Sequence, residues 1–338
     1  MLMGTEFYLE CHAFLERHNR THNTTMHFTI QSNILLYNNK WRAVLDKVFK
    51  SGLSTSYEYN NQLRTVKGSA EIYSRLFESK LAKLKEDGIT AQVIYVFNND
   101  NINDTTTIYN ENLNSTNPHN IRINYMHPEG RAKTNNITLL DPERYTAALL
   151  TLYDRWITDC PAFNVSPLEQ LLRITAGDNE DQCPWTSTCV GSMLSVEPNG
   201  DVYNCPDFQL LDNGDYCFGN IFNDTIGQYG TNIRVRDNRL SSTEQLMLSA
   251  PAKKLYKRRI KIPPDCIRCK HYRECKGGCM KEILVYEQGL GGKFHYCHSW
   301  YHIIARIKES ILSGEADNIL TKLNIEPTTA RRRVKLYE

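Results

Sequence analysis

Nine of the chain's eleven cysteines lie within a stretch of 115 residues, and the thiols of eight of them are the side chains with the clearest chemistry. They form two runs, Cys183-x5-Cys189-x15-Cys205 and Cys266-x2-Cys269-x5-Cys275-x3-Cys279-x17-Cys297. Thiolates are soft donors that suit zinc or the irons of an iron–sulfur cluster, and each cubane takes four of them. Eight cysteines therefore predict two complete ligand sets for [4Fe-4S] clusters.

The spacing of the second run favours iron–sulfur ligation over other uses of cysteine. The pair Cys266 and Cys269 lets two thiolates reach one metal centre from a tight turn, and Gly277-Gly278 leaves room for backbone to pass close to a cluster. A structural zinc ribbon remains an alternative, but it usually has a second short knuckle that these spacings lack. Disulfides are disfavoured where thiols stay reduced. The other cysteines fit neither run, and we interpret them as apolar fillers: Cys11, Cys160 and Cys217.

Composition limits the class of protein. A length of 338 residues favours two structural units, and 40 Lys and Arg residues nearly balance 38 Asp and Glu residues. This balance argues against nucleic acid as the main partner, and the basic runs 253–259 and 331–333 are interpreted as solvated faces. No run of about 18 apolar residues predicts a membrane span. The first residues lack the features of a secretory signal, so we expect a cytoplasmic location.

The elements expected to position these residues begin with alternating strands and helices. Strands are predicted at 27–33, 53–59, 89–97 and 121–126, and helices at 41–50 and 69–87. Ser69 is the expected N-cap of the second helix, with Ile72, Leu76, Leu81 and Leu84 buried. The Asn-, Asp- and Thr-rich residues 98–120 are expected to be a loop. Such repeated strand–helix units predict a parallel sheet with ligands at the carboxyl ends of its strands.

The second half is expected to depend on metal for its folding. Asp141 can cap a helix that starts at Pro142, and Ser166-Pro167-Leu168-Glu169 is a capping box. A hairpin is predicted at 190–204 around the turn Pro198-Asn199-Gly200-Asp201, and a closing helix at 298–312. The residues after it are expected to form a loose tail. Short strands, turns and cysteines make a small core that a bound metal would have to complete.

Residues 183–300 resemble the SPASM domain, the C-terminal extension of radical-SAM enzymes such as anaerobic sulfatase maturases and the maturases of ribosomal peptides. The resemblance rests on the cysteines, the hairpin around Gly200, Phe218-Gly219-Asn220-Ile221 and Cys275-Lys276-Gly277-Gly278-Cys279. It implies that the first auxiliary cluster is bound by Cys183, Cys189, Cys205 and Cys279. It implies that the second is bound by Cys266, Cys269, Cys275 and Cys297. The sequence alone leaves other partitions of the eight ligands open.

The first half resembles a radical-SAM barrel. Gly4-Thr5-Glu6-Phe7 stands where the family has a Gly-Gly-Glu-Pro strand end, which implies that Gly4 and Glu6 hold the amino group of S-adenosylmethionine. Glu6 could instead be an exposed residue at the start of a helix. Asn33, Ser54 and Ser56 resemble the family's polar positions facing the methionine and ribose, or they could be ordinary turn residues. Residues 125–131 resemble the last barrel strand and its exit turn.

The chain departs from the family in two places. It contains no Cys-x3-Cys-x2-Cys motif, which binds the cluster that generates the 5'-deoxyadenosyl radical. We favour an N-terminally truncated sequence, with a degenerate non-catalytic homologue as the alternative. The family also has a catalytic aspartate directly after the third cysteine of the first run, whereas here Pro206 precedes Asp207. Asp207 remains the candidate base, or a turn residue, and its displacement favours peptide cross-linking or a similar modification over formylglycine formation.

The predicted fold class is α/β: a partial radical-SAM (β/α) barrel at 1–140, a connecting helix at 141–165, a cysteine-rich SPASM domain with short hairpins and helices at 166–312, and a tail at 313–338. The predicted function is that of a two-cluster part of a radical-SAM/SPASM enzyme that modifies a peptide or protein, such as a ribosomal precursor peptide. S-adenosylmethionine and a third [4Fe-4S] cluster are expected only in a full-length enzyme, with a flavodoxin or ferredoxin as reductant. Nucleic acids and membranes are not expected as partners. The alternatives are a non-catalytic iron–sulfur module and a zinc-stabilised interaction protein.

Overall fold

The computed structural model describes the chain except for residues 2, 51, 61–62, 117, 130, 135–136, 179–182, 187–188, 212–213, 223–241, 287–288 and 338. It divides into two compact units. The first comprises residues 1–126 and 138–169, and the second comprises residues 127–137 and 170–338.

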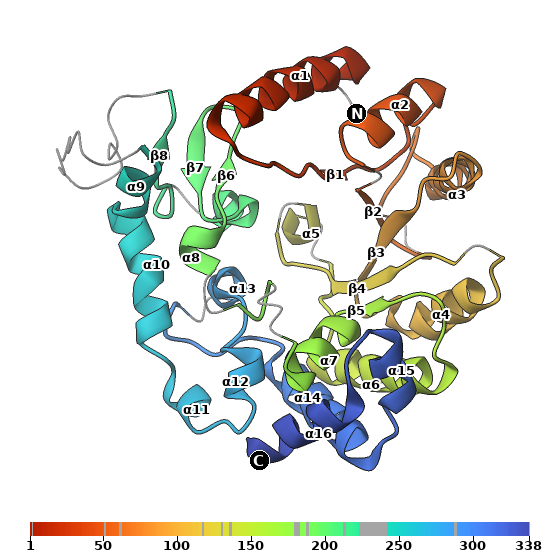
Figure 1. Cartoon of the computed structure of the whole chain (residues 1–338), viewed down its shortest axis with the longest axis vertical. Coiled ribbons are helices and arrows are strands. Elements are labelled where there is room, and N and C mark those ends of the chain that lie inside the picture. The colour runs from red at the N-terminus through yellow and green to blue at the C-terminus, as the bar shows by residue number, and fades with distance from the viewer. Residues whose placement is uncertain are drawn as a thin grey trace. The chain divides into compact units, whose positions relative to one another are not determined.

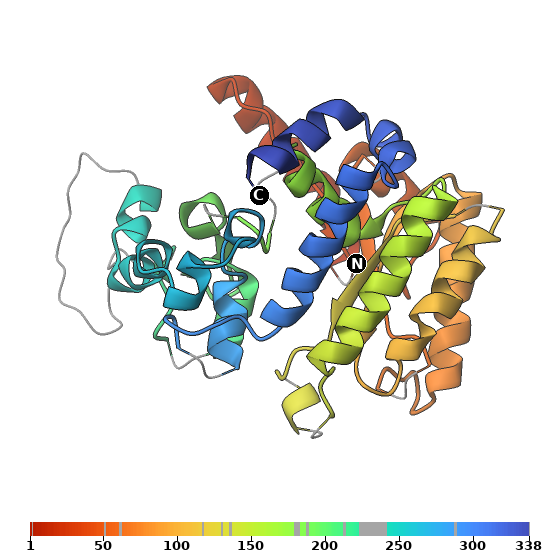
Figure 2. The same cartoon turned by 90° about the horizontal axis from the view of Figure 1, so that it is seen from below.

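The first unit is built on a five-stranded parallel sheet with strand order β1-β2-β3-β4-β5. Its strands are β1 (Ile30–Gln31), β2 (Leu53–Tyr57), β3 (Ala91–Phe97), β4 (Ile121–Tyr125) and β5 (Val165–Ser166). Its helices are α1 (Gly4–His22), α2 (Asn39–Lys47), α3 (Ala70–Glu86), α4 (Thr105–Leu113) and α6 (Pro142–Asp159). Figures 1 and 2 show α3, α4 and α6 covering one face of the sheet. The predicted parallel sheet with crossover helices is thereby confirmed.

The two faces of this sheet differ in burial. In β2, Leu53, Thr55 and Tyr57 are buried, whereas Ser54 and Ser56 between them are only partly buried. The same alternation runs along β3 and β4, because successive side chains of a strand point to opposite faces. One face is therefore packed, and the other is only partly buried, with polar side chains on β2 and β4 and the apolar Ile94 and Val96 on β3.

Helix α3 begins as predicted but buries a different set of side chains. The Ser69 hydroxyl accepts a hydrogen bond from the backbone N–H of Ile72 (3.2 Å), which confirms the N-cap. The buried residues are Tyr73, Phe77 and Leu84, whereas Ile72 is exposed, so of the predicted set only Leu84 is correct. The aromatic face of α3 is the buried one because Phe77 stacks on Tyr57 of β2, with ring centroids 4.4 Å apart.

Two segments of the first unit form helices that the sequence did not predict. Residues 98–120 contain the turn η1 (Ile102–Asp104) and α4, not only a loop. Asn112 can be buried there because its side chain donates to the carbonyl of His119 (2.8 Å) and accepts from its N–H (3.1 Å). Gly4 and Glu6 lie in the first turn of α1, so the strand end implied by the resemblance is wrong and the alternative, in which Glu6 is an exposed residue at the start of a helix, is confirmed.

The second unit contains a three-stranded antiparallel sheet formed by β6 (Ser195–Val196), β7 (Asp201–Tyr203) and β8 (Gly219–Asn220). The β6–β7 hairpin confirms the predicted turn, in which Gly200 takes a left-handed φ of 89°. Most of the other elements are short, with α14 the longest of them. They are α5 (Arg131–Thr134), α7 (Leu168–Ala176, which starts in the first unit), α8 (Cys189–Ser192), η2 (Pro206–Leu211), α9 (Ser242–Met247), α10 (Ala250–Ile260), α11 (Pro264–Ile267), α12 (Tyr272–Cys275), α13 (Met280–Val285) and α14 (Cys297–Ser313).

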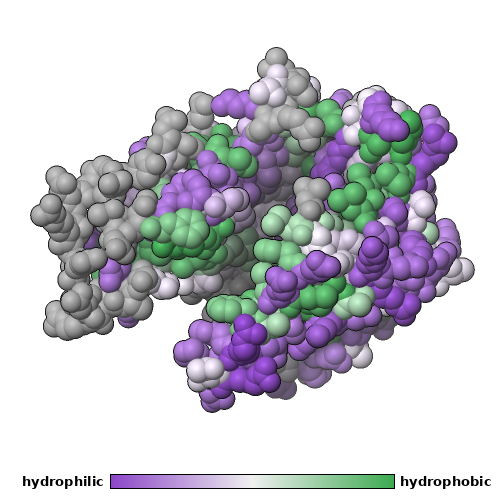
Figure 3. Space-filling view, turned by 90° about the horizontal axis from the view of Figure 1, so that it is seen from above, coloured by the Kyte–Doolittle hydropathy of each residue, from purple (hydrophilic) through white to green (hydrophobic). Residues whose placement is uncertain are grey.

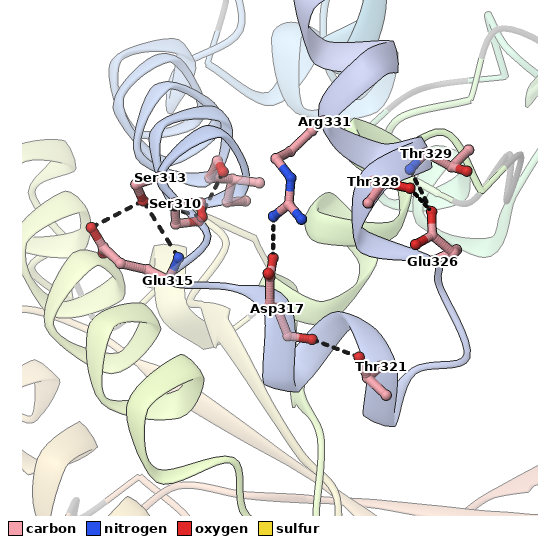
Figure 4. Close-up of polar contacts among 10 residues, drawn as sticks. Ser310, Ser313, Glu315, Asp317, Thr321, Glu326, Thr328, Thr329 and Arg331 are labelled. Atoms are coloured by element: carbon pink, nitrogen blue, oxygen red, sulfur yellow. Dashed lines mark hydrogen bonds and ion pairs between the residues drawn. The ribbon is translucent and has the colours of Figure 1, made fainter.

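The C-terminal residues are ordered helices, so the predicted loose tail is wrong. They form α15 (Asp317–Lys322) and α16 (Pro327–Leu336), and α16 packs against α14 with Val334 buried. Figure 4 shows the polar contacts that fix them, including the ion pair between Arg331 and Asp317. The carboxylate of Glu326 accepts hydrogen bonds from the Thr328 hydroxyl and, as the cap of α16, from the backbone N–H of Thr329, and these hydrogen bonds lower its pKa to about 2.

In the part of the chain that is described, every helix is too short or too polar to cross a bilayer. Figure 3 shows one face of the molecule, on which hydrophilic side chains dominate and apolar side chains gather in smaller areas.

Candidate metal centre

All eight cysteines of the two runs lie in the second unit, and none forms a disulfide. Short helices and turns bring them in from several directions. Cys189 starts α8, Cys205 follows the hairpin, and Cys266 lies in α11. Cys275 ends α12, Cys279 precedes α13, and Cys297 starts α14.

One group of thiols surrounds Cys279. Burial raises the pKa of Cys279 well above its usual range, and the nearby thiols of Cys183 and Cys205 raise it further. Burial raises the pKa of Cys205 to about 12, with Asp207 and Cys189 adding to the effect. The four cysteines Cys183, Cys189, Cys205 and Cys279 also line one cavity of about 370 Å³.

The remaining four thiols form a second group. Burial raises the pKa of Cys275 to about 12, and Cys297, Cys266 and Cys269 act on it in the same direction. Burial likewise raises the pKa of Cys297, which has Cys266 and Cys269 as neighbours. The structure therefore brings the cysteines together in two groups of four. This grouping coincides with the one that the resemblance implies, while the assignment of ligands remains a prediction.

Hydrogen-bond donors approach the sulfur atoms of both groups. The fully buried side chain of Asn204 donates from Nδ2 to Cys189 Sγ (3.1 Å). The backbone N–H of His271 donates to Cys269 Sγ (3.4 Å). Such bonds, with burial, set the reduction potential of an iron–sulfur centre.

The donor set and its surroundings fit an iron–sulfur cluster. Buried thiols with raised pKa values are poor thiolates by themselves, and a bound cationic centre reverses that preference. Gly277 has a φ of 84°, and an added Cβ there would lie 3.3 Å from Arg258 Nη2 and 3.9 Å from Cys266 Sγ. The positive φ thus favours a glycine beside the second group, while the close approach to a cluster remains a prediction. Within the described ranges no three Cys, His, Asp or Glu side chains are close enough to hold a single ion. In a cubane each thiolate binds a different iron.

A buried charged network beside the first group escaped the sequence analysis. Lys281 has a side chain that is only 2% exposed, and its Nζ lies 2.9 Å from Glu129 Oε2 and 3.4 Å from Asp207 Oδ2. Asp207 and Lys281 both line the cavity. Burial lowers the pKa of His127 to about 4, with the charge of Lys281 acting in the same direction. No motif or spacing pointed to Lys281, since 74 residues separate it from Asp207.

The residues predicted to bind S-adenosylmethionine lie in the first unit. Gly4 and Glu6 are exposed on α1. Asn33 follows β1, and its Oδ1 accepts from the N–H of Leu35 (3.3 Å). Ser54 and Ser56 lie on the polar face of β2.

Arg64, which sequence analysis did not select, holds Ser56 in place. Its Nη2 donates to Ser56 Oγ (3.0 Å) and its Nε donates to Glu58 Oε1 (2.8 Å). These contacts orient the polar end of β2.

Known proteins share this architecture. The chain is 25% identical over 306 residues to a cysteine-type anaerobic sulfatase-maturating enzyme of Clostridium perfringens (strain ATCC 13124), and the match covers 88% of the chain and 76% of the relative. The enzyme of the same name from strain 13 is 24% identical, with coverage of 89% and 76%. A solved structure of anSMEcpe with bound AdoMet matches at a TM-score of 0.72 and 18% identity, covering 98% of this chain and 81% of that one. The native form with AdoMet and the Cp18Cys peptide gives 0.73 at 20%, with coverage of 94% and 83%. No family model matches the chain.

Proposed function

We propose a function from the premise that this chain is a distant homologue of the anaerobic sulfatase-maturating enzymes and has the radical-SAM/SPASM fold. In this proposal the chain binds two auxiliary [4Fe-4S] clusters and belongs to a peptide- or protein-modifying enzyme. The observation that carries the proposal is the gathering of eight thiols, all but that of Cys183 buried or partly buried, into two groups of four. The relative's structures with bound peptides support a peptide substrate.

In this proposal the clusters would supply one-electron chemistry. The chain's own residues would bind the clusters and tune their reduction potentials. Cys183, Cys189, Cys205 and Cys279 hold one cluster, and Cys266, Cys269, Cys275 and Cys297 hold the other. Asn204 donates a hydrogen bond to the first set, and the backbone of residue 271 donates one to the second, which tunes each site.

Asp207 is the proposed base at the first cavity. Its carboxylate lines the cavity beside Cys205 and is about half exposed, so a proton can leave it for solvent. Lys281 fixes the position of this carboxylate from the buried side, 3.4 Å away. Because Pro206 separates Asp207 from Cys205, we propose peptide cross-linking or a related modification in preference to formylglycine formation.

Metal content of protein reconstituted without oxygen tests the proposal. We expect about eight irons and eight acid-labile sulfides per chain, and about four of each in Cys279→Ser and in Cys297→Ser, since each variant loses one ligand set. The matched control is Cys160→Ser, which should keep about eight because Cys160 lies at the end of α6 in the first unit. Stoichiometric zinc in a colourless preparation, or equal iron in all three variants, would refute the two-cluster assignment.

A non-catalytic iron–sulfur module is the second candidate, and one observation favours it: the sequence has no Cys-x3-Cys-x2-Cys motif. We expect the reconstituted chain, reduced with dithionite, to form no 5'-deoxyadenosine from S-adenosylmethionine. The genomic sequence before Met1 separates the two candidates, because the enzyme requires that motif and the module does not. Release of 5'-deoxyadenosine by this chain would overturn the ligand assignment itself.

A further inference from the structure

The basic residues of the chain are concentrated in one segment. Between residues 253 and 276 lie ten of the 40 Lys and Arg residues but only two of the 38 Asp and Glu residues. The rest of the chain therefore carries an excess of acidic residues. A charge difference of this size between neighbouring parts of a protein creates a local field that attracts an acidic partner.

Three lysines of this segment face solvent and have no carboxylate near them among the described residues. The side chains of Lys253 and Lys257 are exposed on one face of α10 at four-residue spacing, and Lys261, the C-cap residue that follows the helix, is also exposed. No carboxylate among the described residues is within ion-pair distance of these three. The two acidic residues do not neutralise the face, because Glu274 is buried against Lys308 (3.2 Å) and Asp265 pairs with Lys293 (3.6 Å).

Two large apolar side chains lie among these charges. Ile260, at the end of α10, is 80% exposed, and Ile267, at the end of α11, is 67% exposed. Arg259 directly precedes Ile260 in the chain, and Arg268 directly follows Ile267. Both arginines are also exposed. Apolar side chains within a charged rim are the usual composition of a protein–protein contact. Single-stranded nucleic acids bind by stacking their bases on exposed aromatic side chains. The exposed large apolar side chains described in this segment include no aromatic ring.

The same segment supplies three thiols of the second group. Cys266 lies in α11 next to Ile267, Cys269 follows two residues later, and Cys275 ends α12. Figure 1 shows α10, α11 and α12 following one another within the second unit. The basic segment thus also supplies three of the ligands proposed for the second cluster.

We propose that the exposed face of α10 and α11, the basic face, is the docking site of an acidic one-electron carrier protein of the flavodoxin or ferredoxin class. This inference rests on the proposed function, because the second cysteine group must hold a redox centre for a carrier to dock there. Docking forms no covalent bond, and the carrier exchanges one electron with the protein. Contacts of this kind are small and weak, and their association is steered by charge, so their affinity falls as salt rises.

Binding of an oxidised flavodoxin to the reconstituted protein, measured by calorimetry at 50 and 300 mM salt, tests the proposal. We expect binding that weakens with salt and that falls about tenfold in the triple variant Lys253→Gln, Lys257→Gln, Lys261→Gln, since Gln keeps helix propensity while removing charge. The matched control is Lys133→Gln, Arg332→Gln, Lys335→Gln, which removes the same charge from exposed positions elsewhere in the second unit and should bind within twofold of wild type. A second variant, Ile260→Ser, should weaken binding without altering its salt dependence.

Equal binding by both triple variants, or no binding by the wild type, would refute the docking site. So would a DNA duplex that binds as tightly as the flavodoxin and responds to the same substitutions. Iron content of each variant separates this result from the proposed function. Protein with about eight irons and no preference for the basic face contradicts only the docking site, whereas protein without iron contradicts the two-cluster function.

Discussion

Lys281 carries its positive charge in a nearly fully buried position, and Glu129 and Asp207 compensate for it. Removing one partner of a buried pair leaves the other charge without compensation, which costs about 3–5 kcal/mol. We expect Lys281→Met to lower the free energy of unfolding by about that amount, as measured by chemical denaturation. The double variant Lys281→Met, Glu129→Gln should recover a large part of the loss. If the two substitutions are additive, the pair does not couple as the distances indicate.

His119 gives the first unit a pH-dependent stability. Its ring is buried and its Nε2 lies 3.2 Å from the hydroxyl of Tyr95, and burial lowers its pKa to about 4. The unfolded chain, with an ordinary His pKa near 6.5, takes up a proton at higher pH than the folded protein does. The folded state therefore loses stability as pH falls from about 6.5 to about 4, by roughly 2 kcal/mol between pH 7 and pH 5.

Denaturation of wild type and His119→Gln at pH 7 and pH 5 checks this expectation. The variant should lose about 2 kcal/mol less than the wild type over the same interval. An identical loss in both proteins would show that other groups cause the pH dependence.

At the scale of elements, helix α3 depends on its N-cap. Ser69→Ala removes the acceptor for the N–H of Ile72 and should lower the free energy of unfolding by about 1 kcal/mol. Ser79→Ala is the matched control, because Ser79 is an exposed residue of the same helix and Ala has the higher helix propensity. The control should be neutral or slightly stabilising, and equal losses in the two variants would argue against the cap.

The elements also show how far sequence patterns reach. The strands, the caps at Ser69 and Asp141, the hairpin and the closing helix follow from local signals such as capping residues and alternating hydrophobicity. The buried face of α3 depends on the ring of Phe77 finding Tyr57 in a neighbouring strand, which no local pattern contains. Helix α4 was missed because its Asn and Thr residues are typical of loops, and their burial is made possible by contacts such as those between Asn112 and His119.

For the whole molecule, the second unit should depend on bound metal more than the first. The first unit has a sheet with a packed face, whereas the second has short helices and a small antiparallel sheet around buried thiols. Binding of metal to a site that does not exist in the unfolded chain contributes directly to folding. We expect chelation to open residues 183–297 to limited proteolysis while β2, β3 and β4 stay protected, as mass spectrometry of the fragments would report. Equal cleavage of both units, or of neither, contradicts this dependence.

The candidate site was partly predictable at this scale. The eight cysteines are visible in the sequence because cysteine is rare and its spacing is distinctive. The network of Lys281, Glu129 and Asp207 was not, because its members are distant in sequence and are ordinary surface residues by type. Two matching residue types at Gly4 and Glu6 do not specify a strand end, and the helix start that the sequence also allowed is the one formed, by α1.

The two cysteine groups interleave along the chain, since Cys279 of the first group lies between Cys275 and Cys297 of the second. This arrangement has a consequence for the order of cofactor insertion. Neighbouring members of the second group are at most 22 residues apart, whereas 74 residues separate Cys205 from Cys279 in the first. Closing the longer loop costs about 1 kcal/mol more in chain entropy. We therefore expect the second site to be filled first during maturation. Its completion should then place Cys279, four residues beyond Cys275, close to the other three ligands of the first site.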